Sequence, residues 1–257
     1  MEHMRLLLLS NSTMPGEAFF AWPQPLVRDF LRPHPRPLSE GEGGALRIAF
    51  VPYAAVSFSM DDYADTVANV FVEMGHELFS LHRETDPIAA LQHADAIAVG
   101  GGNSFQLLKL LYKHDLVRAI RHRVKDGTPY VGWSAGSNVT CPTIMTTNDM
   151  PICEPPSLRA MNLVPWQINP HYTDQRIAGH GGESRDQRIA EYLELNRDHT
   201  VIGLREGAAL RVEGSSVHLH GTGMRVFRRT MMPVDVAEER TFRIDLKDVD
   251  NAANAGR

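Results

Sequence analysis

Cysteine is scarce in this sequence, which has only Cys141 and Cys153 among its 257 residues. Two cysteines form at most one disulfide, so a secreted scaffold held by several disulfides is excluded, and a reduced, cytoplasmic protein is expected. Long apolar runs are missing as well, because none approaches the ~20 residues of a membrane-spanning helix. The apolar run at residues 6–9 is too short for the core of a signal peptide, and we interpret it as a buried strand.

The sequence also has no excess of positive charge, with 26 Lys and Arg against 31 Asp and Glu and a formal net charge of -5. We therefore expect neither nucleic acid nor a membrane surface as a partner. No two of the 12 histidines stand at the His-x-x-x-His spacing of a helical metal site, so no metal or other cofactor is expected. The remaining composition, 43% hydrophobic and 22% charged, is typical of a soluble globular domain.

Buried apolar runs alternate with segments of helical periodicity along the first half of the chain. The runs predict strands at residues 6–9, 47–51, 77–81, 96–99 and 129–132. The periodic segments predict helices at residues 18–31, 61–74, 86–93, 104–112 and 115–125. This alternation is typical of βαβ units, so we predict an α/β fold in which a mostly parallel sheet lies between two layers of helices.

The pattern weakens after residue 138. We predict strands at residues 166–171 and 200–204, a helix at 184–195, and short antiparallel strands at 209–213, 217–220 and 224–227. Ser184 and Gln187 fit a capping box at the start of that helix. The prediction is one α/β domain over residues 1–232, with a proline- and glycine-rich surface insert at 32–44. Residues 233–257 are expected to be a charged tail whose last residues are disordered.

The pattern around which the chain is organised follows the strand predicted at residues 129–132. Gly132-Trp133-Ser134-Ala135-Gly136 matches Gly-x-Ser-x-Gly, the nucleophile elbow between a strand and a helix. Such a turn holds the serine in a strained backbone conformation, and the glycines avoid clashes where strand and helix cross. The match is weak alone, because most such matches are ordinary turns. Its place at a strand's carboxyl end strengthens it, since sites in parallel sheets gather there.

A second strand end carries the run Gly100-Gly101-Gly102-Asn103. A serine nucleophile needs N–H donors for the oxyanion, and glycine lets the backbone come close to a substrate. We predict that the amides of Gly101, Gly102 and Ala135 form an oxyanion hole. The alternatives are a plain strand–helix turn and a phosphate-binding loop, and the second is disfavoured because no Gly-Lys-Ser/Thr follows.

A serine hydroxyl also needs a base and a group that orients the base. His171 follows a predicted strand and a proline, on the side where Ser134 should lie. Two carboxylates could orient it. Asp149 gives the chain order Ser, Asp, His of the α/β hydrolases, and Glu206 stands at the end of the next strand. The residues alone do not choose between them, and either also fits the role of a helix cap or a turn residue.

Seven segments carry longer and more specific motifs. They are LLLSNS (7–12), VGGGNSFQLL (99–108), GWSAGSN (132–138), CPTI (141–144), TTNDMP (146–151), QINPH (167–171) and IGLREG (202–207). Together they resemble peptidase E, the bacterial α-aspartyl dipeptidase family, in the family's order across about residues 5–212. The insert at 32–44 and the segment after about residue 232 depart from the family pattern, and neither touches a motif.

The resemblance implies a flavodoxin-like fold similar to class I glutamine amidotransferases, with serine in place of their cysteine. It implies hydrolysis of dipeptides with an amino-terminal aspartate through an acyl-enzyme, without a metal. Ser134 matches the family nucleophile and His171 its base. The family has been described with either carboxylate as third member, so we favour Asp149 and keep Glu206 as a rival or additional carboxylate.

The resemblance also implies a small peptide as the partner of this site, in a monomer or a homodimer. Asn103 and Arg185 are expected to bind the substrate, because a guanidinium would pair well with the aspartate side chain. The sequence names no acceptor for the substrate's free amine. A cyanophycinase-like serine exopeptidase and a non-catalytic module that binds acidic peptides are the alternatives. A class I amidotransferase is disfavoured because the elbow carries serine.

Overall fold

The computed structural model describes residues 3–32, 44–175, 181–237 and 239–249. The strands are β1 (Arg5–Leu9), β2 (Arg47–Val51), β3 (Glu77–Ser80), β4 (Ala96–Val99), β5 (Tyr130–Trp133), β6 (Gln167–Tyr172), β7 (Thr200–Arg205), β8 (Ala208–Glu213), β9 (Ser216–Gly221), β10 (Met224–Arg228), β11 (Val234–Val236) and β12 (Arg240–Arg243). The helices are α1 (Gln24–Leu31), α2 (Met60–Glu73), the 3₁₀ helix η1 (Leu81–Arg83), α3 (Pro87–Gln92), α4 (Ser104–Lys113), α5 (Leu116–Lys125), α6 (Ala135–Asn138) and α7 (Arg185–Leu195).

The first five strands form the parallel part of an eight-stranded sheet with the order β12-β9-β8-β1-β5-β4-β2-β3. Strand β1 pairs with β5, β5 with β4, β4 with β2, and β2 with β3, all in parallel. Strands β8, β9 and β12 extend the other edge in antiparallel pairs. The predicted α/β fold with a mostly parallel sheet is therefore confirmed. We call β1–β5 with their helices the amino-terminal half, and β6–β12 with α7 the carboxyl-terminal half.

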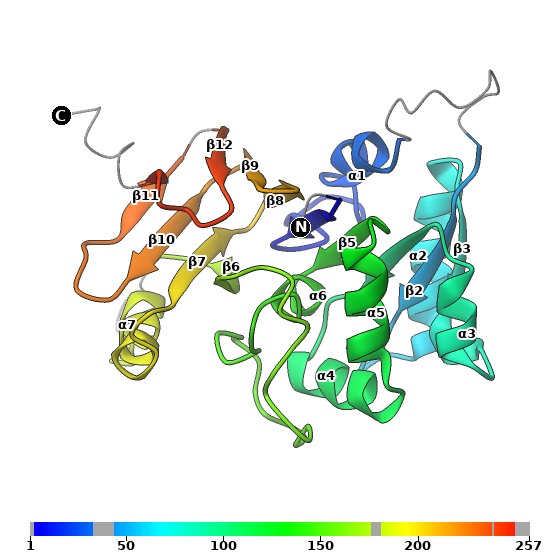
Figure 1. The fold of residues 1–257 in the computed structure, drawn as a ribbon, viewed down its shortest axis with the longest axis horizontal. Helices are drawn as coiled ribbons and strands as arrows, with labels where there is room; N and C mark the ends of the chain where they lie inside the picture. Colours follow the sequence, from blue (N-terminus) through cyan, green and yellow to red (C-terminus); the bar gives the residue numbers. More distant parts are fainter. Residues whose placement is uncertain (1–2, 33–43, 176–180, 238, 250–257) are drawn as a thin grey trace.

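Helices cover both faces of the parallel strands, which gives the three layers seen in Figure 1. Side chains of α1 and α2 pack in one apolar cluster with strand residues such as Phe50 and Trp133. Side chains of α3, α4 and α5 pack in another cluster with strand residues such as Val51 and Ile97. Successive strand residues point to opposite faces, so strands buried on both sides read as continuous apolar runs. None of the helices in the described part of the chain is long and apolar enough to cross a membrane.

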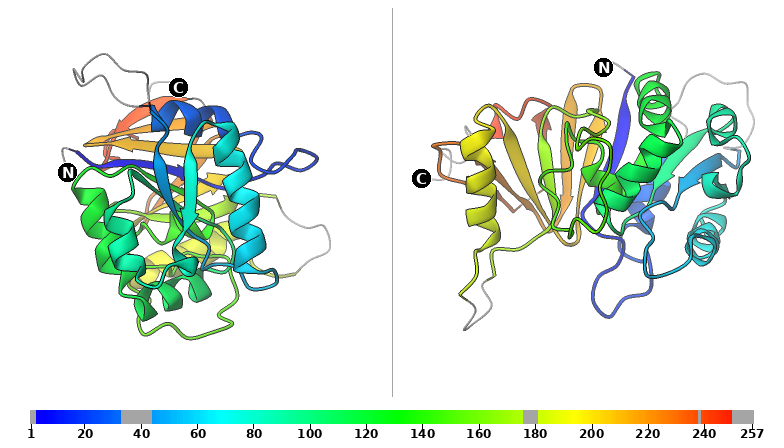
Figure 2. Two further views of the ribbon diagram at one scale, coloured as in Figure 1. Left: turned by 90° about the vertical axis from the view of Figure 1, so that its right-hand side faces the viewer. Right: turned by 90° about the horizontal axis from the view of Figure 1, so that it is seen from below.

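A second sheet in the carboxyl-terminal half was not predicted. It has four strands in the order β11-β10-β7-β6, of which β6 and β7 are parallel and the other pairs are antiparallel. One face shares an apolar cluster with β8 and β9, through Ile202, Val226, Leu210 and Leu219 among others. Helix α7 covers the other face through Ile189 and Leu193 (Figures 1 and 2). The short alternating strands were recognisable in the sequence, but their division between two sheets was not.

The boundary predicted for the carboxyl-terminal tail is wrong. Residues 234–236 pair with β10, and residues 240–243 pair with β9, so both sheets gain an edge strand from this segment. Phe242 is buried, which explains why so charged a segment docks. The helix predicted to begin at residue 18 begins at Gln24, with Pro25 in its first turn, where proline is tolerated. Almost all of the insert at 32–44 and the last residues of the tail lie outside the described residues.

Candidate active site

Ser134 stands on a sharp turn between β5 and α6. Its backbone has φ 52° and ψ -113°, a conformation that residues other than glycine rarely adopt. Its amide donates to the Leu9 carbonyl at 3.1 Å. Such strain persists only where the surrounding structure enforces it, and it is common at functional sites. The sequence pattern for an elbow at this serine therefore corresponds to a strained strand–helix turn.

Close backbone packing enforces this turn. A Cβ placed on Gly136 would lie 2.1 Å from the carbonyl oxygen of Val99, on the neighbouring strand. A Cβ on Gly132 would lie 2.6 Å from the carbonyl oxygen of Gly136. Both distances are far below van der Waals contact, so neither position admits a side chain. Ser137, one turn into the helix, donates its hydroxyl to the carbonyls of Leu9 and Gly132 and ties the elbow to two strands.

The glycine run after β4 lies directly against the serine. A Cβ on Gly101 would lie 2.9 Å from the Cβ of Ser134. The amides of Gly101, Gly102 and Ala135 donate no hydrogen bond to another described residue. Unpaired N–H groups beside a nucleophile are the donors that an oxyanion needs. The structure thus brings the three predicted amides to the two turns that flank Ser134.

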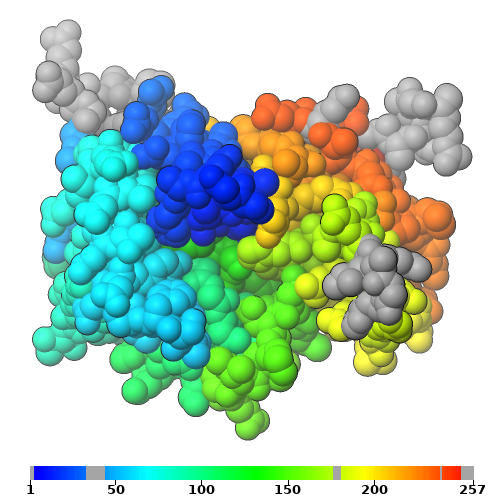
Figure 3. Space-filling model, turned by 180° about the vertical axis from the view of Figure 1, so that it is seen from behind, coloured from blue at the N-terminus to red at the C-terminus, as the bar shows by residue number. Residues whose placement is uncertain are grey.

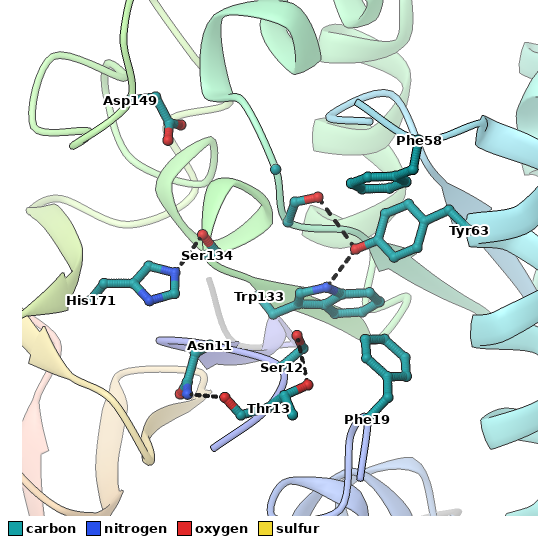
Figure 4. A pocket seen from close by; sticks show the side chains of 12 residues that line it. Asn11, Ser12, Thr13, Phe19, Phe58, Tyr63, Trp133, Ser134, Asp149 and His171 are labelled. Carbon is teal, nitrogen blue, oxygen red and sulfur yellow. Dashed lines mark hydrogen bonds between the residues drawn. The ribbon is translucent and has the colours of Figure 1, made fainter. Parts of the chain in front are cut away.

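A buried tyrosine holds the glycine turn in place. Trp133 Nε1 donates to the Tyr63 hydroxyl at 2.8 Å, and that hydroxyl donates to the Gly101 carbonyl at 3.3 Å (Figure 4). Burial raises the pKa of Tyr63 far above its usual value, so the hydroxyl keeps its proton. Sequence reasoning missed this role of Tyr63, because on α2 it reads as one of the apolar positions of the helix.

His171 reaches Ser134 from a bulge in β6. The pairing of β6 with β7 changes register between Asn169 and Tyr172, and His171 has a positive φ of 52°. The bulge turns the imidazole toward the elbow, with Nε2 2.9 Å from the Ser134 hydroxyl oxygen (Figure 4). The backbone amide of His171 donates to the Ser10 hydroxyl at 2.9 Å, and that hydroxyl donates to the Leu204 carbonyl. Ser10 therefore joins the end of β1 to both β6 and β7.

Glu206 is the carboxylate that contacts the histidine. Its Oε1 lies 2.8 Å from His171 Nδ1. A carboxylate only accepts, so Nδ1 carries the proton, and Nε2 is free to accept from the serine hydroxyl. Glu206 stands in the turn after β7, where the amide of the next residue, Gly207, donates to Asn11 at 2.9 Å. Ser10 and Asn11, which sequence reasoning missed as supports, directly follow β1, the strand that pairs with β5.

Asp149, which we favoured as the third member, makes its hydrogen bonds elsewhere. Its Oδ2 accepts from the Ser104 amide at 2.7 Å and from the Thr147 hydroxyl at 3.0 Å, so it caps the start of α4. Figure 4 shows its carboxylate on the far side of Ser134 from the turn after β1 and apart from the imidazole of His171. The structure brings Ser134, His171 and Glu206 together in one hydrogen-bonded chain, and Asp149 is not part of that chain.

A cavity of about 470 Å³ opens over Ser134. Aromatic side chains line one side of the cavity, and the turn after β1 lines another. Besides Tyr63, the titratable residues of the lining are Asp149 and His171. The lining residues are Asn11, Ser12, Thr13, Phe19, Phe58, Tyr63, Gly101, Gly102, Trp133, Ser134, Asp149 and His171. The segment after β1 stands out from the molecular surface between the two halves in Figure 3. The volume suits a small ligand.

The family of the chain follows from comparison with known proteins. The model of Peptidase family S51 matches residues 6–220. The chain belongs to peptidase family S51. It is therefore a peptidase, and a hydrogen-bonded Ser134–His171 pair agrees with the serine class of the family.

Two relatives of this S51 peptidase extend over most of its length. Peptidase E of Nostoc sp. is 46% identical over 217 residues, which cover 84% of this chain and 86% of that protein. Peptidase E of Haemophilus influenzae is 44% identical over 225 residues, which cover 88% and 96%. The resemblance to the peptidase E family found in the motifs is thereby confirmed.

Solved structures share the fold of this S51 peptidase. A protein from Listeria monocytogenes described as a peptidase E has a TM-score of 0.63 and 22% identity, with 85% of this chain and 98% of that chain covered. A peptidase from an acI-B1 actinobacterium has a TM-score of 0.65 and 15% identity, with 94% and 98% covered. At these identities the likeness concerns the fold alone.

The two residues expected to bind substrate lie outside the cavity lining. Asn103 caps α4, because its Oδ1 accepts from the amides of Phe105 and Gln106 while its Nδ2 donates to the Met150 carbonyl. Arg185 is the first residue of α7 and is half-buried. The structure thus gives Asn103 a local structural contact and does not bring Arg185 to the cavity.

Two further groups of reactive side chains lie outside the cavity lining. Cys141 is fully buried, and burial raises the pKa of its thiol to about 12, so it stays protonated at neutral pH. His218, His220 and Glu239 place one ligand atom each within 4.8 Å of one another, close enough for the three to share one metal ion. The sequence analysis considered only the His-x-x-x-His spacing of a helix. His218 and His220 are alternate residues of strand β9 and therefore share one face of it.

Proposed function

We propose that the chain hydrolyses dipeptides with an amino-terminal aspartate, with Ser134 as nucleophile, His171 as base and Glu206 as the group that orients it. One observation carries the proposal: the hydrogen-bonded chain from Glu206 through His171 to Ser134, beside three unpaired amides. Its arrangement matches the general requirements of serine catalysis. We assign Glu206, rather than Asp149, to the triad on this contact.

The reaction then follows from the positions of protons. His171 Nε2 takes the hydroxyl proton as Ser134 Oγ attacks the carbonyl carbon of the aspartyl residue. The amides of Gly101, Gly102 and Ala135 stabilise the negative oxygen of the tetrahedral intermediate. The imidazolium, held by Glu206, gives its proton to the leaving amine, and an acyl-enzyme remains. Water attacks with His171 again as base, and aspartate is released.

Selectivity for aspartate requires donors for the side-chain carboxylate. The hydroxyls of Ser12 and Thr13 line the cavity, on the side opposite Asp149 in Figure 4. We assign them this role, with Arg185 as the alternative, because its guanidinium makes no hydrogen bond to another described residue. The ratio of kcat/KM for Asp-Leu to that for Asn-Leu separates the two assignments. It should fall in Ser12→Ala if the hydroxyls recognise the carboxylate, and in Arg185→Met if the guanidinium does.

The function is tested with a panel of Asp-Leu, Glu-Leu, Ala-Leu and cyanophycin, using the wild type and Ser134→Ala. We expect cleavage of Asp-Leu alone and a loss of kcat of about 10⁶-fold in the variant. Cleavage that survives Ser134→Ala would exclude the serine mechanism. Cleavage of cyanophycin would favour a cyanophycinase-like exopeptidase, and binding of Asp-Leu without cleavage by the wild type would favour a binding module.

A further inference from the structure

The cavity over Ser134 contains a carboxylate that the proposed triad does not use. Asp149 is the one acidic residue among the residues that line the cavity, and no lysine or arginine lines it. Its side chain makes two hydrogen bonds within the described chain, from the Ser104 amide and the Thr147 hydroxyl, and both use Oδ2. Its Oδ1 accepts no hydrogen bond from the described residues. The side chain therefore combines a negative charge, partial burial and a free lone pair in the site.

The contacts at Oδ2 fix the direction of the other oxygen. The Ser104 amide is the first of helix α4, and it donates to Oδ2 together with the Thr147 hydroxyl. Both contacts come from the side of α4 and the Thr147 turn. Oδ1 makes neither of these contacts, and Figure 4 shows the Asp149 carboxylate directed toward the site around Ser134, in the cavity that Asp149 lines. A fixed anion in such a place suits a small cationic group.

We propose that Asp149 binds the free α-ammonium group of the substrate, so that it selects peptides whose aspartate is amino-terminal. This rests on the proposed hydrolysis of Asp-Xaa dipeptides. The α-amine is attached to the carbon next to the scissile carbonyl, so its acceptor must line the same cavity as Ser134. A desolvated ammonium without a partner would be strongly disfavoured, which makes one carboxylate a strong filter for a free amino terminus.

Succinyl-leucine tests this assignment, because the succinyl group is an aspartyl group without its amine. Asp149→Asn keeps an oxygen that can cap Ser104 and removes only the charge. We expect the wild type to prefer Asp-Leu, and the variant to lose about 10²-fold in kcat/KM for Asp-Leu with little change for succinyl-leucine. Thr147→Val is the matched control, since it loosens the same turn without removing the charge, and it should affect both substrates equally.

Binding gives a second readout that needs no turnover. L-aspartate and succinate are titrated into Ser134→Ala with and without Asp149→Asn. Aspartate should bind more tightly than succinate when Asp149 is present, and the difference should vanish without it. An equal loss for both ligands, or an unchanged preference, would overturn the ammonium site and leave Asp149 as a helix cap. Failure of the wild type to cleave Asp-Leu would instead refute the proposed function.

A second inference concerns the group formed by His218, His220 and Glu239, away from the cavity. The two histidines are alternate residues of β9, and their rings lie 4.4 Å apart between centroids. His218 Nδ1 lies 2.7 Å from the Thr241 hydroxyl, which leaves Nε2 available. His220 Nδ1 lies 3.7 Å from Glu239 Oε1, too far for a hydrogen bond and near the spacing of two ligands on one metal ion.

We infer that these three side chains bind a divalent transition metal such as Zn²⁺. Two imidazoles and a carboxylate are a ligand set that zinc accepts, and Thr241 would orient the first imidazole. The nearby Arg211 is paired with Glu213 and Asp29, so its charge is offset. A bound metal would join the segment before β12 to β9.

Zinc titration against a chromogenic chelator tests this site in the whole protein. We expect one ion per chain, a loss of binding in His218→Ala and His220→Ala, and about 10-fold weaker binding in Thr241→Val. His122→Ala, which removes an exposed histidine paired with Asp126, is the matched control and should not change binding. No binding by the wild type, or equal binding by the His218→Ala/His220→Ala double variant, would overturn the assignment.

Discussion

The two halves of the molecule hold their parts of the site by different means. The amino-terminal half holds Ser134 through close contacts of backbone, as at Gly136, next to the buried and stacked rings of Phe50 and Trp133. The carboxyl-terminal half holds His171 and Glu206 on a bulge and a turn, with side chains 40% and 46% exposed. Steric packing fixes the nucleophile, and a few hydrogen bonds fix its partners. Substitutions in the two halves should therefore fail in different ways.

Glu206→Gln should have the largest effect on activity. The amide cannot hold the imidazolium, and it can select the wrong tautomer of His171, so we expect kcat to fall by about 10⁴-fold. The melting temperature should hardly change, because both side chains are half-exposed. Steady-state kinetics with Asp-Leu and thermal unfolding measure the two quantities.

Glu77→Gln, at an exposed carboxylate on β3, is the control for loss of one negative charge. Glu206→Gln should slow Asp-Leu and succinyl-leucine equally, unlike Asp149→Asn. Suppose that kcat falls less than 10-fold in Glu206→Gln, while Asp149→Asn loses much activity equally on both substrates. That result would assign Asp149, and not Glu206, to the triad.

Gly136→Ala should break the amino-terminal half by sterics. The added Cβ would meet the Val99 carbonyl oxygen at 2.1 Å, and backbone cannot move aside as a flexible side chain can. We expect a loss of about 3 kcal/mol or more in the free energy of unfolding, together with loss of activity. Gly181→Ala is the matched control, because a Cβ there meets nothing within 4 Å. Chemical denaturation measures both, and a loss in Gly136→Ala no larger than the control's would refute steric fixation.

Sequence reasoning succeeded where local patterns carry the structure. Each strand of the parallel sheet is a continuous apolar run, and the glycines of the elbow are visible because no other residue fits. The capping box of Ser184 and Gln187 was likewise confirmed, since capping needs only residues close in sequence. These features do not depend on knowing which strands are neighbours.

Sequence reasoning failed where distant segments meet. The contact of Glu206 with His171 depends on the pairing of β6 with β7 and on a bulge that no local pattern predicts. Asp149 precedes His171 in the chain and fits a familiar order of triad residues, yet its carboxylate caps α4. The second sheet and the docking of residues 234–236 and 240–243 are equally matters of long-range pairing. Charge in that segment obscured the few apolar residues, such as Phe242, that are buried.

Ser10→Ala should weaken the junction between the halves. The hydroxyl accepts from the His171 amide and donates to the Leu204 carbonyl. Its removal takes this hydrogen bond from the His171 amide and from the buried Leu204 carbonyl. We expect a loss of about 1–3 kcal/mol in the free energy of unfolding. We also expect a moderate fall in kcat with KM unchanged, because the imidazole is displaced while the cavity remains. Ser59→Ala, which removes the N-cap of α2, should cost about 1 kcal/mol without affecting kcat.

The smallest effect should come from alkylation of the cysteines, which probes packing without changing the sequence. The fully buried thiol of Cys141 has a pKa of about 12, raised by burial, so at pH 7 it is protonated and unreactive. Cys153 is partly exposed and should react with iodoacetamide in the native protein. Mass spectrometry should find one modified cysteine and unchanged peptidase activity. Rapid modification of Cys141 in the folded protein would mean that the packing behind the elbow opens readily. The amino-terminal half would then not be held more rigidly by its packing than the carboxyl-terminal half is by its hydrogen bonds.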